Sequence, residues 1–352
     1  MTATGIEAPP SSTGWRVWGH DHAVHELRSA IDKGVRHAYI LSGYHHVGKT
    51  ALAQEFARAL MCGSSPSPGQ PCGVCSACRR VGRGAHPDVT LYDLARQQET
   101  SDKASTSKNL SLNIQTVRDI TSSISLRPME ARHRVVIVDD VETMQETAQE
   151  AFLKTLEEPP PYAVILLLTT DAELLLETIR SRCMTLHLQT VRPSTILDLL
   201  LATGLDEKDA TAIAAASIGR PGWAVQAASD PNILRERLEL ESLVKGWITG
   251  DQYRRMVEAT RLGDVFSKDR AAVYARLSLA QTMWREIVLH ALGVVDVDRP
   301  DKNIFEGQQP TAGEGVTALR SVERCLNDLD ANVRPKLALQ SMVLQWPTIA
   351  AR

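Results

Sequence analysis

A glycine-rich segment, GYHHVGKT, occupies residues 43–50 and restricts the possible folds more than any other part of the sequence. It follows the apolar run 37–41 and precedes residues 51–53, where helical spacing begins. The glycines of such a segment let backbone N–H groups wrap a polyphosphate, while its lysine reaches the β- and γ-phosphates and its threonine binds Mg²⁺. A glycine-rich turn that merely caps a helix is the weaker interpretation. The sequence therefore predicts a strand, a phosphate-binding loop and a helix, with four nucleotide-binding residues: Gly43, Gly48, Lys49 and Thr50.

Short apolar runs of the β type alternate with longer helical patterns from about Trp15 to about residue 190. The runs cover residues 37–41, 89–92, 134–138 and 163–168. Continuous apolarity is typical of strands that are covered on both faces, and alternation with helices is typical of a parallel sheet. We therefore predict an α/β domain with a parallel sheet over residues 15–188.

The rest of the chain is predicted to be helical. Helical spacing recurs in residues 194–201, 207–217 and 234–248, and Gly219-Arg220-Pro221-Gly222 is interpreted as a turn. We predict a small helical lid domain over 189–229 and an all-α domain over 230–352, in which apolar residues such as Leu238, Leu243 and Trp247 fit packed helices. Residues 1–14, rich in Pro, Ser and Thr, are predicted to form a flexible leader.

Composition narrows the class of protein. The chain has 352 residues, a formal charge of −3, and 43% hydrophobic and 23% charged residues, which excludes disordered and collagen-like proteins. Near-neutral charge also argues against a strongly basic DNA-coating protein. No apolar run approaches the roughly 18–20 residues that a membrane-spanning helix needs. Without a secretory signal at its start, the chain is expected in the cytoplasm.

The third apolar run ends in two carboxylates, Asp139 and Asp140. We expect Asp139 to hold Mg²⁺ through water. Asp140 occupies the catalytic place where many nucleotide hydrolases have Glu to orient the attacking water. Its carboxylate is one methylene shorter, and a misplacement of roughly 1 Å can cost about 10²-fold in rate. ATP binding is therefore better supported than ATP hydrolysis. The alternative that Asp140 is only a solvated acid capping the next helix stays open.

Four of the six cysteines lie between residues 62 and 78, at the spacing C-x9-C-x2-C-x2-C. Such clustering favours a metal over disulfides, and four thiolates saturate a tetrahedral Zn²⁺, so the site would be structural and not catalytic. Chance cysteines do not readily explain two successive CxxC steps. His45, His46 and His86 are weaker candidates as ligands. The predicted zinc module thus has four ligands: Cys62, Cys72, Cys75 and Cys78.

The order of these motifs resembles one protein family. The phosphate loop, the cysteine insertion and the Asp-Asp strand are followed by FLKTLEEPP at 152–160, by Thr169-Thr170 and by Ser181-Arg182-Cys183. Over residues 15 to about 225, this order resembles the bacterial clamp-loader AAA+ subunits of the DNA polymerase III holoenzyme, and it is most similar to the delta-prime subunits. The resemblance implies an AAA+ domain and a C-terminal helical collar where subunits associate.

The resemblance also implies roles for single residues. Arg182 corresponds to an arginine finger, which acts in trans on the ATP of a neighbouring subunit. Thr170 corresponds to the polar sensor at the end of the fourth strand, with Thr169 as the fallback. A surface salt bridge is the alternative for Arg182. Where the ATP-hydrolysing gamma/tau subunits carry a nucleotide-sensing arginine in the lid, this chain has Gly222, and Arg220 is a poor substitute.

Two functions follow from these features. The first is a delta-prime subunit that assists ATP-dependent loading of the sliding clamp onto primer-template DNA, in a hetero-oligomeric ring with gamma/tau and delta subunits. The second is a self-sufficient gamma/tau-type ATPase, which the intact Lys49, Thr50 and Asp139 favour. A free-standing zinc module that binds nucleic acid fits poorly. The expected cofactors are structural Zn²⁺ and ATP with Mg²⁺, and turnover by the isolated chain is expected to be weak or absent.

Overall fold

The chain divides into two compact units, Met1–Ser229 and Asp230–Arg352. The computed structural model describes residues 8–94, 111–294 and 309–348. Each unit has hydrophobic clusters of its own. A further division of the first unit into a nucleotide-binding domain and a lid stays a prediction.

The first unit is built on a five-stranded sheet in which every neighbouring pair is parallel. Its order is β2-β3-β4-β1-β5. The predicted α/β fold with a parallel sheet is therefore confirmed. β5 was not predicted, because this edge strand is short and only one of its four residues is buried. The strands are β1 (Ala38–Ser42), β2 (Val89–Tyr92), β3 (Arg134–Val138), β4 (Ala163–Thr169) and β5 (Met184–His187).

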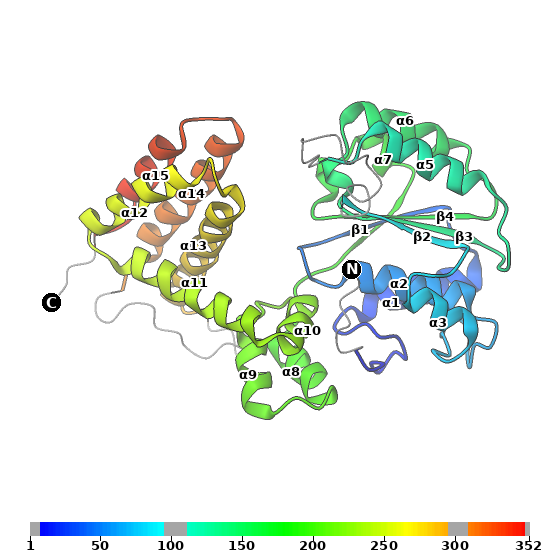
Figure 1. Ribbon diagram of the computed structural model, residues 1–352. Helices are drawn as coiled ribbons and strands as arrows, with labels where there is room; N and C mark the ends of the chain where they lie inside the picture. Colours follow the sequence, from blue (N-terminus) through cyan, green and yellow to red (C-terminus); the bar gives the residue numbers. More distant parts are fainter. Residues whose placement is uncertain (1–7, 95–110, 295–308, 349–352) are drawn as a thin grey trace. The chain divides into compact units, whose positions relative to one another are not determined.

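Two layers of helices cover the sheet (Figure 1). One layer consists of α1 (Asp21–Lys33), α2 (Lys49–Met61) and α3 (Ser76–Gly82). The other consists of α5 (Ile114–Ser125), α6 (Glu146–Glu157) and α7 (Glu177–Arg180). Every residue of β1, β3 and β4 is buried, as expected for strands that pack on both faces. One core gathers around Trp15 and Phe56, and the other around Ile120 and Phe152.

Residues 9–14 make hydrogen bonds to the folded part, although they were assigned to the predicted leader. The indole Nε1–H of Trp18 donates to the carbonyl of Pro9 over 2.9 Å, and a guanidinium N–H of Arg28 donates to the carbonyl of Thr13 over 3.1 Å. An indole N–H that is removed from water needs an acceptor, and here the leader supplies it. Residues 1–7 of the predicted leader lie outside the described residues.

Three further α-helices lie in the described part of the first unit: α8 (Pro193–Ala202), α9 (Glu207–Ala216) and α10 (Pro221–Ser229). The prediction of a turn at residues 219–222 is wrong for its second half, because α10 already begins at Pro221. Proline suits the first turn of a helix, where its missing N–H would have no partner inside the helix. Gly222 therefore lies in the first turn of α10.

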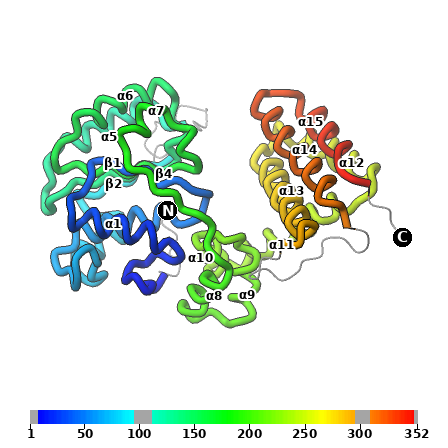
Figure 2. The backbone as a smooth tube through the Cα atoms, turned by 180° about the vertical axis from the view of Figure 1, so that it is seen from behind, coloured from blue at the N-terminus to red at the C-terminus, as the bar shows by residue number. Residues whose placement is uncertain are grey.

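The described part of the second unit is helical, as predicted; Figure 2 shows its bundle from the opposite side to Figure 1. Trp247, Trp284 and Trp346 meet in its core, with ring centroids 4.9 and 5.5 Å apart. No helix in the described ranges is long and apolar enough to cross a membrane. The helices are α11 (Pro231–Thr249), α12 (Gln252–Val265), α13 (Arg270–Ala291), α14 (Ala312–Asp330) and α15 (Pro335–Leu344).

The packing predicted for α11 is only partly correct. Trp247 is buried, but Leu238 and Leu243 are 47% and 55% exposed. The buried residues of α11 are Val244, Trp247 and Ile248, which form one face near its C-terminal end. Leucines elsewhere on this helix do not reach that core, because a helix buries only the stripe that faces its neighbours.

Candidate nucleotide and metal sites

The phosphate loop joins the end of β1 to the first residue of α2. Lys49 is buried, and its Nζ donates to the carbonyls of Gly43 at 2.6 Å and Tyr44 at 3.1 Å. Gly43 is at φ 155°, where a Cβ would lie 2.4 Å from the carbonyl oxygen of Leu188. Gly48 is at φ 116°, a conformation that L-residues rarely adopt. Both motif glycines are thus needed for the shape of this loop.

Thr50 and Asp139 are brought together from α2 and the end of β3. The Thr50 hydroxyl donates to Asp139 Oδ2 over 2.9 Å. Burial lowers the pKa of Lys49, and the carboxylates of Asp139, Glu142 and Asp140 act in the opposite direction. The loop, a hydroxyl and a carboxylate therefore lie at one edge of the sheet, which is the donor set that a phosphate-bound Mg²⁺ uses. Their roles as ligands stay a prediction.

Asp140 follows directly and has an unusual backbone. Its φ is 54°, in the left-handed region, which Asp tolerates better than most residues. Burial raises the pKa of Asp140, and the neighbouring carboxylates of Asp139 and Glu142 raise it further. The side chain of Asp140 is one methylene shorter than that of Glu, which makes it a weak choice for orienting water. Its catalytic role stays a prediction.

The two threonines after β4 have different partners. Thr169 is fully buried, and its hydroxyl donates to the carbonyl of Asp171 over 2.8 Å. Thr170 is partly exposed, and its hydroxyl donates to Glu142 Oε1 over 2.7 Å. The backbone N–H of Thr170 donates to the same oxygen over 3.1 Å. The sensor role of Thr170, with Thr169 as the fallback, stays a prediction.

Sequence reasoning missed Glu142. It lies in η1 (Val141–Thr143), a single 3-10 turn after the Asp-Asp pair. Burial acts to raise the pKa of Glu142, but hydrogen bonds to its carboxylate, the strongest from the Thr170 hydroxyl, together outweigh burial and lower the pKa below its usual value. The only signal in the sequence was a third acid two residues beyond Asp140, and such acids are common on surfaces.

The first turn of α10 lies against the phosphate loop. The backbone N–H of Gly222 donates to the carbonyl of His46 over 2.9 Å. A Cβ at Gly222 would lie 2.8 Å from that same oxygen. His46 itself has a φ of 62°, and burial and the charge of Arg220 lower its pKa. Gly222, which stands where the gamma/tau subunits carry the nucleotide-sensing arginine, therefore has no room for a side chain while α10 contacts the loop at His46.

Replacing Gly222 by Arg is expected to weaken nucleotide binding by roughly tenfold, instead of restoring a sensor. The new Cβ would push the loop backbone at His46 away from the position that its Gly222 contact now fixes. Losing one hydrogen bond and displacing the loop together account for about 1–2 kcal/mol, and 1.4 kcal/mol is tenfold in affinity. Titration with a fluorescent ATP analogue measures the change. Tighter binding, or faster hydrolysis, by G222R would contradict this expectation.

The four predicted zinc ligands converge on one point. One sulfur from each of Cys62, Cys72, Cys75 and Cys78 lies within 4.8 Å of all the others. Burial raises the pKa of Cys62 and Cys78, whereas backbone N–H groups of Cys75 and Val74 lower the pKa of Cys72 to about 6. The cluster can hold a metal ion, and four sulfurs suit Zn²⁺. No histidine is part of it among the described residues.

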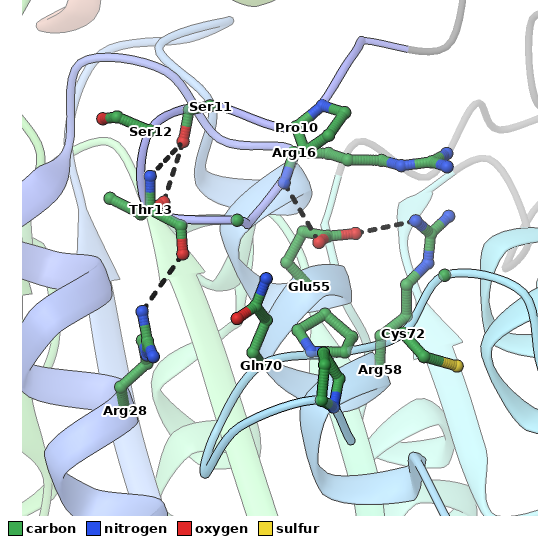
Figure 3. A pocket seen from close by; sticks show the side chains of 14 residues that line it. Pro10, Ser11, Ser12, Thr13, Arg16, Arg28, Glu55, Arg58, Gln70 and Cys72 are labelled. Carbon is green, nitrogen blue, oxygen red and sulfur yellow. Dashed lines mark hydrogen bonds and ion pairs between the residues drawn. The ribbon is translucent and has the colours of Figure 1, made fainter. Parts of the chain in front are cut away.

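A cavity of about 430 Å³ adjoins this cluster, and Cys72 is part of its wall (Figure 3). Glu55 of α2 lies in the same wall, accepting hydrogen bonds from the backbone N–H of Arg16 over 3.1 Å and from Arg58 over 2.7 Å. Glu55 therefore fastens α2 to the segment before α1. This helix begins at Lys49 and is followed directly by Cys62, so the phosphate loop and the cysteine cluster lie about 20 Å apart at its two ends.

Arg182 is 34% exposed and lies in the turn between α7 and β5. Its guanidinium pairs with Glu157 Oε1 over 2.7 Å and donates to the carbonyl of Thr178 over 2.9 Å. The surface salt bridge that was weighed against an arginine finger therefore exists in this chain. An exposed ion pair of this kind contributes little free energy, so it does not prevent the side chain from binding elsewhere.

Comparison with known proteins gives a family for this arrangement. Residues 19–192 match the family described as DNA polymerase III, delta subunit. The chain is 34% identical to DNA polymerase III subunit tau of Escherichia coli over 176 residues, which are 50% of this chain and 25% of that protein. It is 32% identical to DNA polymerase III subunit gamma of Buchnera aphidicola over 183 residues, 52% of this chain and 46% of that protein. The chain thus spans about a quarter to a half of these relatives.

Among solved structures, the chain is similar to a DNA polymerase III gamma subunit-related protein from Thermotoga maritima. The two are 19% identical, with 92% of this chain and 97% of that chain covered and a TM-score of 0.39. A RuvB variant from Thermotoga maritima is 14% identical, with 94% and 90% covered and a TM-score of 0.42. The family match over residues 19–192, just under half of the chain, and the tau and gamma relatives together support a bacterial DNA polymerase III clamp-loader AAA+ subunit.

Proposed function

We propose that this chain is a subunit of the delta-prime type, which helps a clamp loader to place the sliding clamp on primed DNA. The observation that carries this proposal is the contact between Gly222 and His46, because it leaves no room for a nucleotide-sensing side chain in the lid. The short side chain of Asp140, where many nucleotide hydrolases have Glu, is expected to weaken turnover further. A subunit with these features contributes to the assembly by other means than hydrolysis in its own site.

Arg182, a surface residue, is the group through which the chain would contribute to ATP hydrolysis in a neighbouring subunit. The side chain ends in a guanidinium, and its current partner Glu157 is itself 49% exposed. On a subunit edge, such a guanidinium reaches the phosphates of a neighbour and stabilises charge on them. The proposed partners are accordingly a gamma/tau subunit that binds ATP and a delta subunit, with the sliding clamp and primer-template DNA as the targets of the assembly.

The alternative is a self-sufficient ATPase of the gamma/tau type. The contact between Thr50 and Asp139 favours it, since these are the groups that hold Mg²⁺ in such enzymes. The two proposals agree that the chain binds nucleotide through Lys49. They differ in whether the isolated chain turns it over.

Steady-state ATPase measurements separate the two functions. The purified chain is assayed alone, and then with gamma/tau and delta subunits, the sliding clamp and primed DNA. We expect little turnover by the chain alone, and a DNA- and clamp-stimulated rate that depends on adding it to the other subunits. Turnover by the isolated chain as fast as that of the whole assembly would instead establish the gamma/tau-type enzyme.

A further inference from the structure

Glu142 holds the only hydroxyl proton of Thr170. The Oγ1–H of Thr170 and its backbone N–H both donate to Glu142 Oε1, over 2.7 and 3.1 Å. Hydrogen bonds from a hydroxyl to an ionised carboxylate are about twice as strong as those between neutral groups. Because a threonine hydroxyl carries one proton, Thr170 cannot donate to another acceptor without giving up this bond.

Thr170 also lies close to the start of the phosphate loop. Ser42 of β1 is in register with Thr169 of β4, and the N–H of Gly43 donates to the carbonyl of Thr169 over 3.1 Å. Lys49, whose ammonium group reaches the β- and γ-phosphates in loops of this type, donates to the carbonyl of the same Gly43. The pair formed by Thr170 and Glu142 therefore borders the end of the loop where a terminal phosphate would lie.

Charge at this place is unfavourable for a terminal phosphate. Asp139, Asp140 and Glu142 lie within electrostatic range of Lys49, and each raises its pKa. A Mg²⁺ ion held by Asp139 would offset the negative charge of that carboxylate. Glu142 would not share this ion, because its carboxylate binds Thr170. Its second oxygen, Oε2, is buried and accepts no hydrogen bond in the described part of the chain. A nucleoside triphosphate carries about one more negative charge than the diphosphate, and its γ-phosphate would place that charge beside the Glu142 carboxylate.

We propose that Glu142 makes this site select nucleoside diphosphate over nucleoside triphosphate, by withholding the Thr170 hydroxyl and by placing a negative charge beside the γ-phosphate position. The inference deepens the proposed function and rests on nucleotide binding by the loop. A subunit with such a site would keep ADP in place while its neighbours cycle. Glu142 acts here as a specificity-determining residue, and Thr170 is the group through which it acts.

The test is competition for the site in the full chain. A fluorescent ADP analogue is bound in the presence of Mg²⁺ and displaced by ADP or by the slowly hydrolysed triphosphate ATPγS. We expect the unaltered chain to bind ADP more tightly than ATPγS. Glu142→Ala should shift the ratio of the two dissociation constants by about tenfold toward the triphosphate, since one hydroxyl donor is freed and one charge is removed.

Three further variants separate the causes. Glu142→Gln keeps an acceptor for Thr170 but removes the charge, so it should shift the ratio by a smaller factor. The double variant Glu142→Ala/Thr170→Val lacks the freed hydroxyl. It should therefore lose the part of the shift toward the triphosphate that this hydroxyl causes. Glu146→Gln removes an exposed carboxylate four residues further along and should leave the ratio unchanged.

Each outcome bears on the inference. An unchanged ratio in both Glu142 variants, with circular dichroism showing that they fold, would overturn it, and so would a preference for ATPγS in the unaltered chain. Loss of triphosphate affinity in Glu142→Gln would assign Glu142 a supporting role instead. Failure of the chain to bind any nucleotide would also overturn the inference, but not the role of Arg182, which is judged in the reconstituted assembly.

Discussion

Replacing Arg182 by Ala is expected to lower the DNA- and clamp-stimulated ATPase activity of the reconstituted assembly, and to slow clamp loading. An arginine finger is worth roughly 10³–10⁵-fold in turnover where it is the dominant charge stabiliser, and an assembly with several ATP sites dilutes the loss of one. Folding and nucleotide binding by the chain itself should stay intact. The bonds of Arg182 to Glu157 and Thr178 are exposed, and exposed ion pairs typically contribute about 0–1 kcal/mol.

Arg180→Ala is the matched control. Arg180 lies two residues away and also pairs with a surface carboxylate, Glu173, but it is not part of the Ser-Arg-Cys segment. Arg182→Lys is a second test, because a lysine keeps the charge but lacks the planar fork that binds phosphate oxygens in pairs. It should recover only part of the activity. Equal activity of the Arg182→Ala assembly and the unaltered one would leave Arg182 as a surface residue and contradict its proposed action on the ATP of a neighbouring subunit.

The strands show how far hydrophobic pattern predicts this fold. β1, β3 and β4 are buried on both faces, so their sequences are continuous apolar runs that stand out from the chain. β5 has the sequence MTLH and only Leu186 buried, because an edge strand contacts fewer neighbours. α11 shows the opposite error, since Leu238 and Leu243 are apolar in sequence but exposed. Pattern detects burial well only where an element is covered on all sides.

The site shows a similar division. The phosphate-loop residues were predictable because their chemistry is carried by eight consecutive residues, in a context of strand and helix. Glu142 and Gly222 were not, since each acts through one contact with a residue far along the chain: 28 positions for Thr170 and 176 for His46. Gly222 could be recognised as a missing arginine, but not as a hydrogen-bond donor to the loop. Contacts of this kind depend on the tertiary fold.

Replacing Cys78 by Ser is expected to abolish stoichiometric zinc binding and to lower the thermal stability of the chain substantially. The sulfur of Cys78 is one of four that lie within 4.8 Å of one another. A structural Zn²⁺ needs four protein ligands in a tetrahedron, and the variant would supply only three thiolates. Structural zinc contributes about 10–16 kcal/mol in small peptides, compared with roughly 5–15 kcal/mol of total stability for a typical domain. Elemental analysis and thermal unfolding measure both effects.

The loss should be greatest near the cysteines and smaller at the phosphate loop. Residues 62–78 supply few buried apolar side chains, so the metal is the main source of order there. α2, in contrast, is held by the buried Leu52 and Phe56 and by the bonds of Glu55, so the loop at its start should still bind nucleotide. Cys183→Ser is the matched control, because Cys183 lies outside the cluster and should leave the zinc content unchanged.

Acid should have the same effect as the Cys78 substitution. Zinc binds thiolates, so protons compete with it, and the metal should be released as the pH falls from neutral toward about 5. Burial raises the pKa of the metal-free Cys62 and Cys78 thiols, which makes their sulfurs easier to protonate once the metal leaves. Unfolding followed at several pH values should therefore show stability and zinc content falling together. Zinc well below one equivalent in protein purified without chelator, or full zinc content in Cys78→Ser, would show that these cysteines do not form a metal centre.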